Sequence, residues 1–164
     1  MSLHPRVAEL IEQLQLQPHP EGGHYREFFR SEAGVAPDDG RAKRSALTSI
    51  DFLLARGQCS AWHRVLSDEV WHLLEGGPLR LWLMPPSLDR IESVELAPVS
   101  QRSQPRFTVP AHWWQAAEPL GEFAYVGATV GPGFDFADFA FLRDHPDAVA
   151  AVQSIQPELA RLAR

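Results

Sequence analysis

The start of the chain has the hydrophobic pattern of an amphipathic helix. Between residues 5 and 16, the apolar residues Val7, Leu10, Ile11 and Leu14 recur at offsets of 0, 3, 4 and 7. This spacing gathers them on one face of a helix, with the stripe turned toward a core. The run His-Pro-Glu-Gly-Gly at 19–23 ends the pattern, because proline and paired glycines do not continue a helix. We therefore predict an N-terminal helix over residues 5–16.

From residue 24 the pattern changes to short apolar segments separated by turn residues. The chain has 14 prolines and 11 glycines spread along its length, which indicates many short elements. Short strands at regular spacing are typical of a β-sandwich or barrel. The predicted strands are residues 24–30, 46–54, 60–65, 69–75, 78–84, 93–96, 107–109, 112–117 and 123–130.

A helical pattern returns near the C-terminus. Asp144 and Pro146 have the chemistry of a helix start, and the apolar residues that follow supply a stripe as far as Ile155. Pro157 begins a further short segment. At 164 residues the chain is long enough for one full core. We predict one domain, with a barrel over about 24–130 and a helical segment over about 144–163.

Composition excludes several classes of protein. With 15 basic and 21 acidic residues the net charge is −6, which argues against a nucleic-acid binder. The only basic cluster, Arg41 to Arg44, lies in a polar stretch that we interpret as a solvated loop. No run approaches the roughly 18 apolar residues of a membrane span, and the charged N-terminal segment is unlike a signal peptide. The single cysteine, Cys59, excludes an internal disulfide and suits a buried position. We expect a cytoplasmic protein that binds neither nucleic acid nor membranes.

The most informative stretch of the chain is residues 57–76. Five residues separate Gly57 from His63, five separate His63 from Glu69, and six separate Glu69 from Gly76. This spacing resembles the first motif of the cupin superfamily, except that Val65 stands where the motif has a second histidine. In metal-bearing cupins the two histidines, the glutamate and a later histidine bind one ion inside a small β-barrel.

Four more segments resemble one branch of that superfamily. They are the 19–23 run with Tyr25 and Arg30-Ser31, the run Ser60-Ala61-Trp62-His63, the pair Trp71-His72, and Gly-Pro-Gly-Phe-Asp-Phe at 131–136. In this order they are similar to the RmlC-like cupins that are known only as a domain of unknown function. The resemblance implies an all-β jelly-roll barrel (a double-stranded β-helix) with an internal pocket, and a homodimer. It assigns no reaction, because one fold hosts many functions.

The second cupin motif is degraded. Pro110 keeps the proline position, but Gln115 stands where the family has its metal-binding histidine. Two of the four family ligands are therefore absent, and we predict no cofactor. The alternative is a native divalent metal at His63 and Glu69, which two strong ligands would bind poorly. His19, Glu21 and His24 form another possible ligand cluster, which we interpret as a turn that enters a strand.

Strand alternation sorts the remaining candidates by facing. It places one imidazole, one carboxylate, one carboxamide and two indoles inside the barrel, which predicts a pocket for a flat or ring-shaped organic ligand. The alternative is a filled barrel whose polar groups satisfy one another. The inward residues are His63, Glu69, Trp71, Trp113 and Gln115, and the outward ones are Trp62, Arg64, His72, His112 and Trp114.

The resemblance extends to a possible mechanism. Related deoxysugar-nucleotide epimerases use a metal-free barrel with an inward histidine base and a tyrosine acid. His63 fits the base because imidazole titrates near neutral pH, and Glu69 stands beside it as a catalytic candidate. Tyr25 and Tyr125 are the only tyrosines for the acid, and we choose Tyr125, although the facing of both is open and either can be a packing residue. The predicted ligand-binding residues are Trp71, Trp113, Gln115, His19, Glu21, Tyr25 and Arg30.

Two surface features remain open. The aromatic and acidic segment 132–139 either plugs one barrel end with its Phe side chains, or forms a pocket wall or a dimer contact. An open jelly roll has edge strands that must be covered, and outward Trp62 and Trp114 are candidates for covering them in a dimer. The leading hypothesis is an epimerase or isomerase of a sugar-nucleotide-like ligand. The alternatives are a non-catalytic binding or sensing module, and a metal-dependent oxygenase or isomerase.

Overall fold

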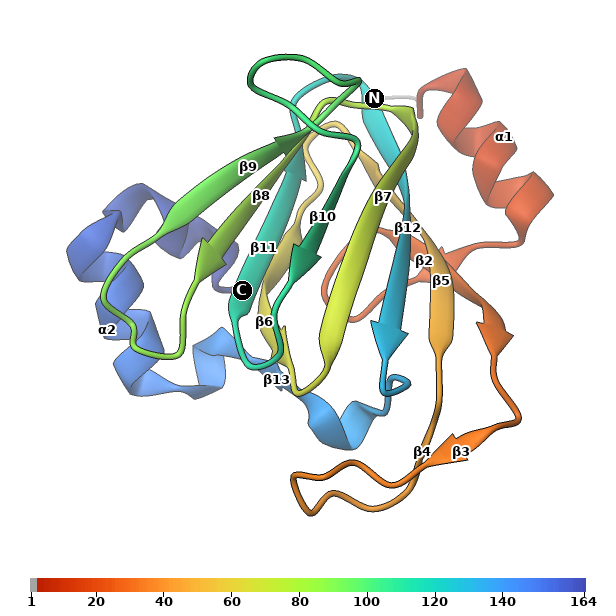
Figure 1. Cartoon of the computed structure of the whole chain (residues 1–164). Coiled ribbons are helices and arrows are strands. Elements are labelled where there is room, and N and C mark those ends of the chain that lie inside the picture. The colour runs from red at the N-terminus through yellow and green to blue at the C-terminus, as the bar shows by residue number, and fades with distance from the viewer. Residues whose placement is uncertain (1–2) are drawn as a thin grey trace.

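A computed structural model describes residues 3–164, which form two facing antiparallel sheets with helices toward both ends of the chain (Figure 1). The larger sheet has the order β1 (Gln17–Pro18), β2 (His24–Arg30), β5 (Thr48–Ala55), β12 (Phe123–Gly131), β7 (Asp68–Gly76) and β10 (Arg106–Val109). The smaller sheet has the order β13 (Phe139–Phe141), β6 (Ser60–Val65), β11 (Trp114–Pro119), β8 (Leu79–Met84) and β9 (Glu92–Leu96). A separate two-stranded hairpin joins β3 (Gly34–Val35) to β4 (Arg44–Ser45).

Successive strands cross between the two sheets, which makes the fold a jelly-roll barrel. Strands β5, β6, β7 and β8 alternate between the larger and the smaller sheet, and every paired strand is antiparallel to its neighbour. This arrangement confirms the predicted all-β architecture. All nine predicted strands are present, with ends that shift by at most two residues. The strands that the sequence did not predict are β1, β3, β4 and β13, each only two or three residues long.

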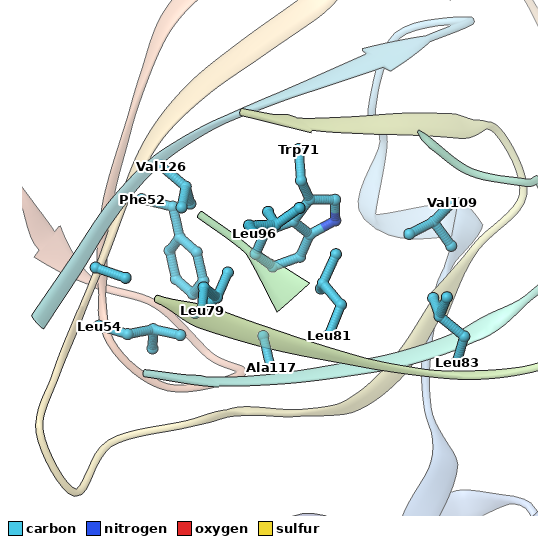
Figure 2. Packing of buried hydrophobic residues seen from close by; sticks show 11 residues of the cluster. Phe52, Leu54, Trp71, Leu79, Leu81, Leu83, Leu96, Val109, Ala117 and Val126 are labelled. Carbon is cyan, nitrogen blue, oxygen red and sulfur yellow. The ribbon is translucent and has the colours of Figure 1, made fainter. Parts of the chain in front are cut away.

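The apolar core fills one part of the space between the sheets. Figure 2 shows Phe52 and Trp71 beside leucines of β8, and the two rings lie 6.0 Å apart at a steep angle. Along β5, Phe52 and Leu54 point into this core, whereas Thr48 and Ile50 line a cavity at the other end of the strand. The inward-facing residues of one strand therefore line the packed core at one end and the open cavity at the other.

The helices cover the outside of the barrel. Helix α1 (Pro5–Leu14) places Val7 and Leu10 against the larger sheet. It ends at Leu14, two residues earlier than predicted, and the capping residue Gln15 is in the left-handed conformation. Helix α2 (Pro146–Ile155) and the 3-10 helices η2 (Leu142–Asp144) and η3 (Pro157–Leu162) follow the smaller sheet. None of the helices within residues 3–164 is long and apolar enough to cross a membrane.

The two outward indoles have a different role from the predicted one. Trp62 and Trp114 do point away from the barrel interior, but both are fully buried in a cluster with residues of η2, α2 and η3. The Trp62 indole N–H also donates to the Leu159 carbonyl at 3.1 Å. The prediction that they cover an edge strand between subunits is therefore wrong, because the C-terminal helices of the same chain already cover them. Cys59 is buried in the same cluster, as expected.

Candidate functional site

A cavity of about 540 Å³ opens between the sheets, at the barrel end opposite the leucine-rich core. Its walls come from β2, β5, β6, β7 and β12, from the turn at 17–21, and from the aromatic segment at 134–139. Of the sequence-predicted residues it includes His19, Glu21, Tyr25, Arg30, His63, Glu69 and Trp71. Residues far apart in the sequence therefore line one surface. Strand alternation predicted this inward facing for His63 of β6 and for Glu69 and Trp71 of β7.

A tight turn delivers Glu21 to the inner wall. Gly22 and Gly23 have φ values of 114° and 71°, which favour glycine, and a Cβ on Gly22 would lie 2.1 Å from the Cys59 carbonyl oxygen. The Ala61 amide donates to the Glu21 carbonyl at 2.8 Å, which docks the turn on β6. The glycines of the 19–23 motif therefore allow the turn that places the Glu21 carboxyl group beside His63 of β6.

Glu21 and His63 lie in close contact in the buried wall of the barrel. The His63 Nδ1 lies 2.7 Å from the Ala61 carbonyl oxygen, and its Nε2 lies 3.1 Å from Glu21 Oε2. A carbonyl can only accept, so Nδ1 of the neutral ring carries the proton, and Nε2 keeps its lone pair on the side of Glu21. Ser60 donates to the other Glu21 oxygen at 2.8 Å. The Glu21 side chain therefore receives one donor and faces one acceptor, an arrangement that suits a protonated carboxyl group.

Burial sets the protonation of this pair. It raises the pKa of Glu21 to about 8, although the Ser60 hydroxyl lowers it somewhat, and it lowers the pKa of His63 despite the nearby Glu69. Both effects disfavour a charge in the closed interior. Near neutral pH Glu21 is therefore protonated, and the transfer of its proton to Nε2 of His63 would leave the net charge of the pair unchanged.

Glu69 belongs to a second buried network. Its Oε1 accepts from the Trp71 indole at 3.1 Å and from the Gln115 amide at 2.9 Å, and the Gln115 oxygen accepts from the same indole at 2.9 Å. Burial raises the pKa of Glu69 to about 7, partly offset by His63. Gln115 is 1% exposed and does not line the cavity, so it orients Glu69 and Trp71 from behind rather than contacting a ligand.

The first histidine of the turn lies on the same wall. His19 accepts from the Glu21 amide at 3.1 Å, and its ring meets Tyr25 edge-on at 4.4 Å. Burial lowers the pKa of His19 to about 3, so this ring stays neutral. Arg30 lies at the exposed rim, where it binds Glu27 through two nitrogens at 2.7 and 2.9 Å and donates to the Phe134 carbonyl. Glu27 was not among the predicted site residues, because residues three apart on a strand are not expected to share a face; an irregularity in β2 between Glu27 and Phe29 changes this alternation.

Besides Gln115, two more predicted site residues, Tyr125 and Trp113, lie outside the cavity. The Tyr125 hydroxyl donates to Asp51 at 2.7 Å, and its ring packs with the α1 cluster on the outer face of the larger sheet. Tyr125 pairs with Leu53, which faces outward because its neighbour Phe52 faces inward, so Tyr125 faces outward too. It does not line the cavity, and its assignment as the catalytic acid is therefore wrong. Trp113 packs against the apolar core and beneath Arg90, 5.5 Å from its ring centre, and does not line the cavity. It precedes β11, which begins at Trp114, so strand alternation does not extend to it.

The segment at 132–139 forms a wall of the cavity. Phe134, Asp135, Phe136 and Phe139 all contribute to its lining. The Phe139 ring stacks on the His63 ring, with 5.3 Å between centres and 17° between planes. Of the two interpretations offered by the sequence, the pocket wall is therefore the one that the structure supports. Ser60 and Phe139 contact the Glu21–His63 pair. Both belong to segments noted in the sequence, but neither was among the predicted site residues.

The donor atoms do not fit the four-ligand metal site of metal-bearing cupins. Val65 has no donor atom, and the Gln115 oxygen is taken by the Trp71 indole. His63 Nε2 is engaged by Glu21, and Glu69 Oε1 already accepts two hydrogen bonds. Within the described residues 3–164, no group of three or more His, Cys, Asp or Glu side chains is arranged to hold one ion. We therefore derive no step through a metal.

Comparison with known proteins agrees with this fold. A family model described as "Cupin superfamily (DUF985)" matches residues 8–142. A hypothetical protein from Leishmania major is 29% identical with a TM-score of 0.79, and the match covers 95% of each chain. A protein from Shewanella oneidensis is 28% identical with a TM-score of 0.78, covering 99% of this chain and 96% of that one. Oxalate decarboxylase from Bacillus subtilis shares the fold alone, at 18% identity and a TM-score of 0.57, with 88% of this chain and 36% of that one covered. No curated protein matches the sequence.

Proposed function

Because this chain belongs to the DUF985 family of the cupin superfamily, we propose that its barrel cavity binds a small organic molecule and moves protons on it, as an epimerase or isomerase does. One observation carries the proposal. Two buried carboxyl groups, Glu21 and Glu69, flank His63 on the cavity wall, and burial raises the pKa of both into the neutral range. Groups that titrate near the working pH are the effective general acids and bases.

The arrangement supplies both halves of a proton transfer. A C–H bond next to a carbonyl loses its proton to one group, and the resulting enolate regains a proton from the other, with no net oxidation. Glu69, whose carboxylate form is held by Trp71 and Gln115, serves as a base. The Glu21–His63 pair serves as the partner that delivers or takes up the second proton. Tyr25 replaces Tyr125 as the hydroxyl that lines the cavity.

The walls favour a ring-shaped, hydroxyl-bearing ligand. Tyr25, Trp71 and Phe139 offer flat apolar faces, while the carboxyl groups and Arg30 offer hydrogen bonds at the wall and the rim. A volume of about 540 Å³ falls within the range of small-molecule sites. Since Glu21 and Glu69 can be neutral near pH 7, the interior does not repel an anionic ligand. These features support a sugar-nucleotide-like or sugar-acid-like molecule.

A non-catalytic binding or sensing module is the second candidate. It is favoured by the internal pairing of the cavity groups, because Glu21 with His63 and Glu27 with Arg30 already satisfy one another. Such pairing is expected of a site that stays rigid and only recognises a ligand. Binding alone does not separate the two candidates, whereas proton exchange on the bound ligand does.

Ligand identification tests the proposal first. Native mass spectrometry of the purified protein, followed by thermal shift with a panel of sugar nucleotides and sugar acids, should yield a stabilising compound. A ligand at 100 times its Kd stabilises the folded state by about 2.7 kcal/mol. Glu69→Gln and His63→Ala should weaken its binding at least about tenfold, since both line the cavity. Glu12→Gln on the exposed side of α1 is the control. A compound that binds wild type and both cavity variants equally would place its site elsewhere.

A further inference from the structure

A buried ion cluster anchors the aromatic wall of the cavity. Asp138 accepts two hydrogen bonds from Arg44, at 3.0 and 2.9 Å, and one from Arg41 at 2.9 Å. The Asp138 side chain is only 2% exposed, and the arginines are 10% and 12% exposed. We call Arg41, Arg44 and Asp138 the clasp. The interpretation of Arg41–Arg44 as solvated is therefore wrong, because two of these side chains are held against a buried carboxylate.

The clasp joins three separate parts of the chain. Arg44 belongs to β4, and Arg41 precedes it in the loop of the β3–β4 hairpin. Arg41 also donates to Ser67 at 3.0 Å, in the turn between the strands that carry His63 and Glu69. Asp138 closes the short 3-10 helix η1 (Phe136–Asp138), immediately before Phe139. The hairpin lies beneath the barrel in the view of Figure 1, below β13.

The wall depends on such anchors because it has little regular structure of its own. Between Gly131 and Phe139 it contains only the three residues of η1, and Phe136 is 56% exposed. Its first half is fixed to the larger sheet by the Phe134 amide, which donates to Thr48 Oγ1 at 2.9 Å. The second half has the clasp, and Phe139 follows it directly. Phe139 is also the first residue of β13, where it lies opposite Val65 of β6. Asp138 therefore fixes the chain at the point where it enters this strand, and its displacement is expected to shift the Phe139 ring that stacks on His63.

We propose that Asp138 is a positioning residue, which through the clasp holds Phe139 stacked on His63 and so keeps the His63–Glu21 pair shielded and aligned on the cavity wall. The importance of this alignment for proton transfer rests on the proposed function. The contact itself does not, because it exists in the protein without a ligand. Planar bidentate binding by Arg44 gives the clasp its geometric precision.

The matched variants are Asp138→Asn and Asp39→Asn. Both remove one negative charge and one partner of Arg41, but Asp39 is exposed and has no contact with the aromatic wall. The readout is the Cε1 proton of His63 in NMR spectra of the ligand-free protein, assigned with His63→Ala. The ring of Phe139 shifts this resonance, and Phe139→Leu gives the position without that ring.

Asp138→Asn should move the His63 resonance at least half of the way to its Phe139→Leu position, whereas Asp39→Asn should leave it in place. The pKa of His63 should also rise toward its ordinary value in Asp138→Asn, since water then reaches the ring. The groups that face His63 in the cavity, His19, Glu21 and Glu69, are the same in all variants. Asp138→Asn combined with Phe139→Leu should resemble Phe139→Leu alone, because both changes act on one contact.

An unchanged His63 resonance in folded Asp138→Asn, or an equal shift in Asp39→Asn, would overturn the proposal. Far-UV circular dichroism reports whether the variant folds. If Asp138→Asn does not fold, Arg41→Gln is measured instead, because it leaves both Arg44–Asp138 hydrogen bonds in place. The His63 resonance should then shift in the same direction by a smaller amount. An unchanged resonance would contradict the role of the clasp. The measurement needs no substrate. A failure here leaves the proposed proton transfer standing, and a protein without catalytic activity leaves this result intact.

Discussion

Replacing Glu21 with glutamine should flatten the dependence of stability on pH between 6.5 and 8. The folded protein keeps the Glu21 proton until about pH 8, whereas the unfolded chain releases it near 4.5. The folded state therefore binds more protons across this interval, and the free energy of unfolding falls as the pH rises. The lowered pKa values of His19 and His63 act in the opposite direction, mainly below their ordinary value of 6.5, and together they offset less than about 1 kcal/mol between pH 6.5 and 8.

The size of the effect follows from the interval. At about 1.4 kcal/mol per pH unit, the part of the Glu21 shift between pH 6.5 and 8 amounts to about 2 kcal/mol. Glu69, with a pKa of about 7, adds less than about 1 kcal/mol in the same direction. With the opposing contribution of the two histidines, wild type should thus lose about 2 kcal/mol of stability from pH 6.5 to 8. Glu21→Gln should remove most of that loss, because glutamine is neutral at both pH values.

Urea unfolding at pH 6.5, 7.25 and 8, followed by far-UV circular dichroism, measures these free energies. Glu12→Gln, an exposed carboxyl group on α1, is the control and should keep the wild-type slope. A wild-type stability that stays constant or rises over this interval would contradict the buried, protonated state of Glu21. The same holds if Glu21→Gln retains the full slope.

Three further substitutions test the surroundings of the site. Gln115→Leu should cost about 1–3 kcal/mol in urea unfolding, because buried Glu69 loses a donor; a neutral result would show that the network does not need this amide. Tyr125→Phe should cost about 1 kcal/mol by losing its bond to Asp51, yet leave ligand affinity in the thermal-shift assay unchanged; weaker binding would return Tyr125 to the site. Trp62→Phe should cost at least about 1 kcal/mol by losing the bond to the Leu159 carbonyl, with no change in molecular mass by sedimentation.

The sequence predicted the barrel well because strand patterns depend on local alternation. His63, Glu69 and Trp71 lie on the inner face, as their spacing along β6 and β7 requires. Trp113 packs against the core between the sheets, as alternation predicted, but it does not line the cavity. The chain at His112 has a positive φ of 72° and β11 begins only at Trp114, so strand spacing does not fix the position of this ring. Alternation could not decide the facing of Tyr125, because a strand with apolar residues on both faces offers no contrast between inside and outside.

Contacts between segments that are far apart in the sequence could not be predicted from the spacing of residues. The contact between Glu21 and His63 joins a turn to a strand about forty residues away, and nothing local in either segment specifies it. The clasp joins Arg41 and Arg44 to Asp138, nearly a hundred residues further along. Charged residues in a polar stretch look solvated from sequence, and only the tertiary fold shows that a buried carboxylate meets them.

Solvent deuterium exchange tests the central claim most directly. The ligand that stabilises the protein is incubated in D₂O with wild type, with His63→Ala and with Glu69→Gln, at concentrations that saturate each one. Its carbon-bound hydrogens are followed by NMR and mass spectrometry. The account predicts deuterium at a single carbon with wild type, at a rate that falls by about 10²–10⁴-fold in either variant. A saturated wild-type protein that incorporates no deuterium, or variants that exchange at the wild-type rate, would contradict proton transfer by these residues.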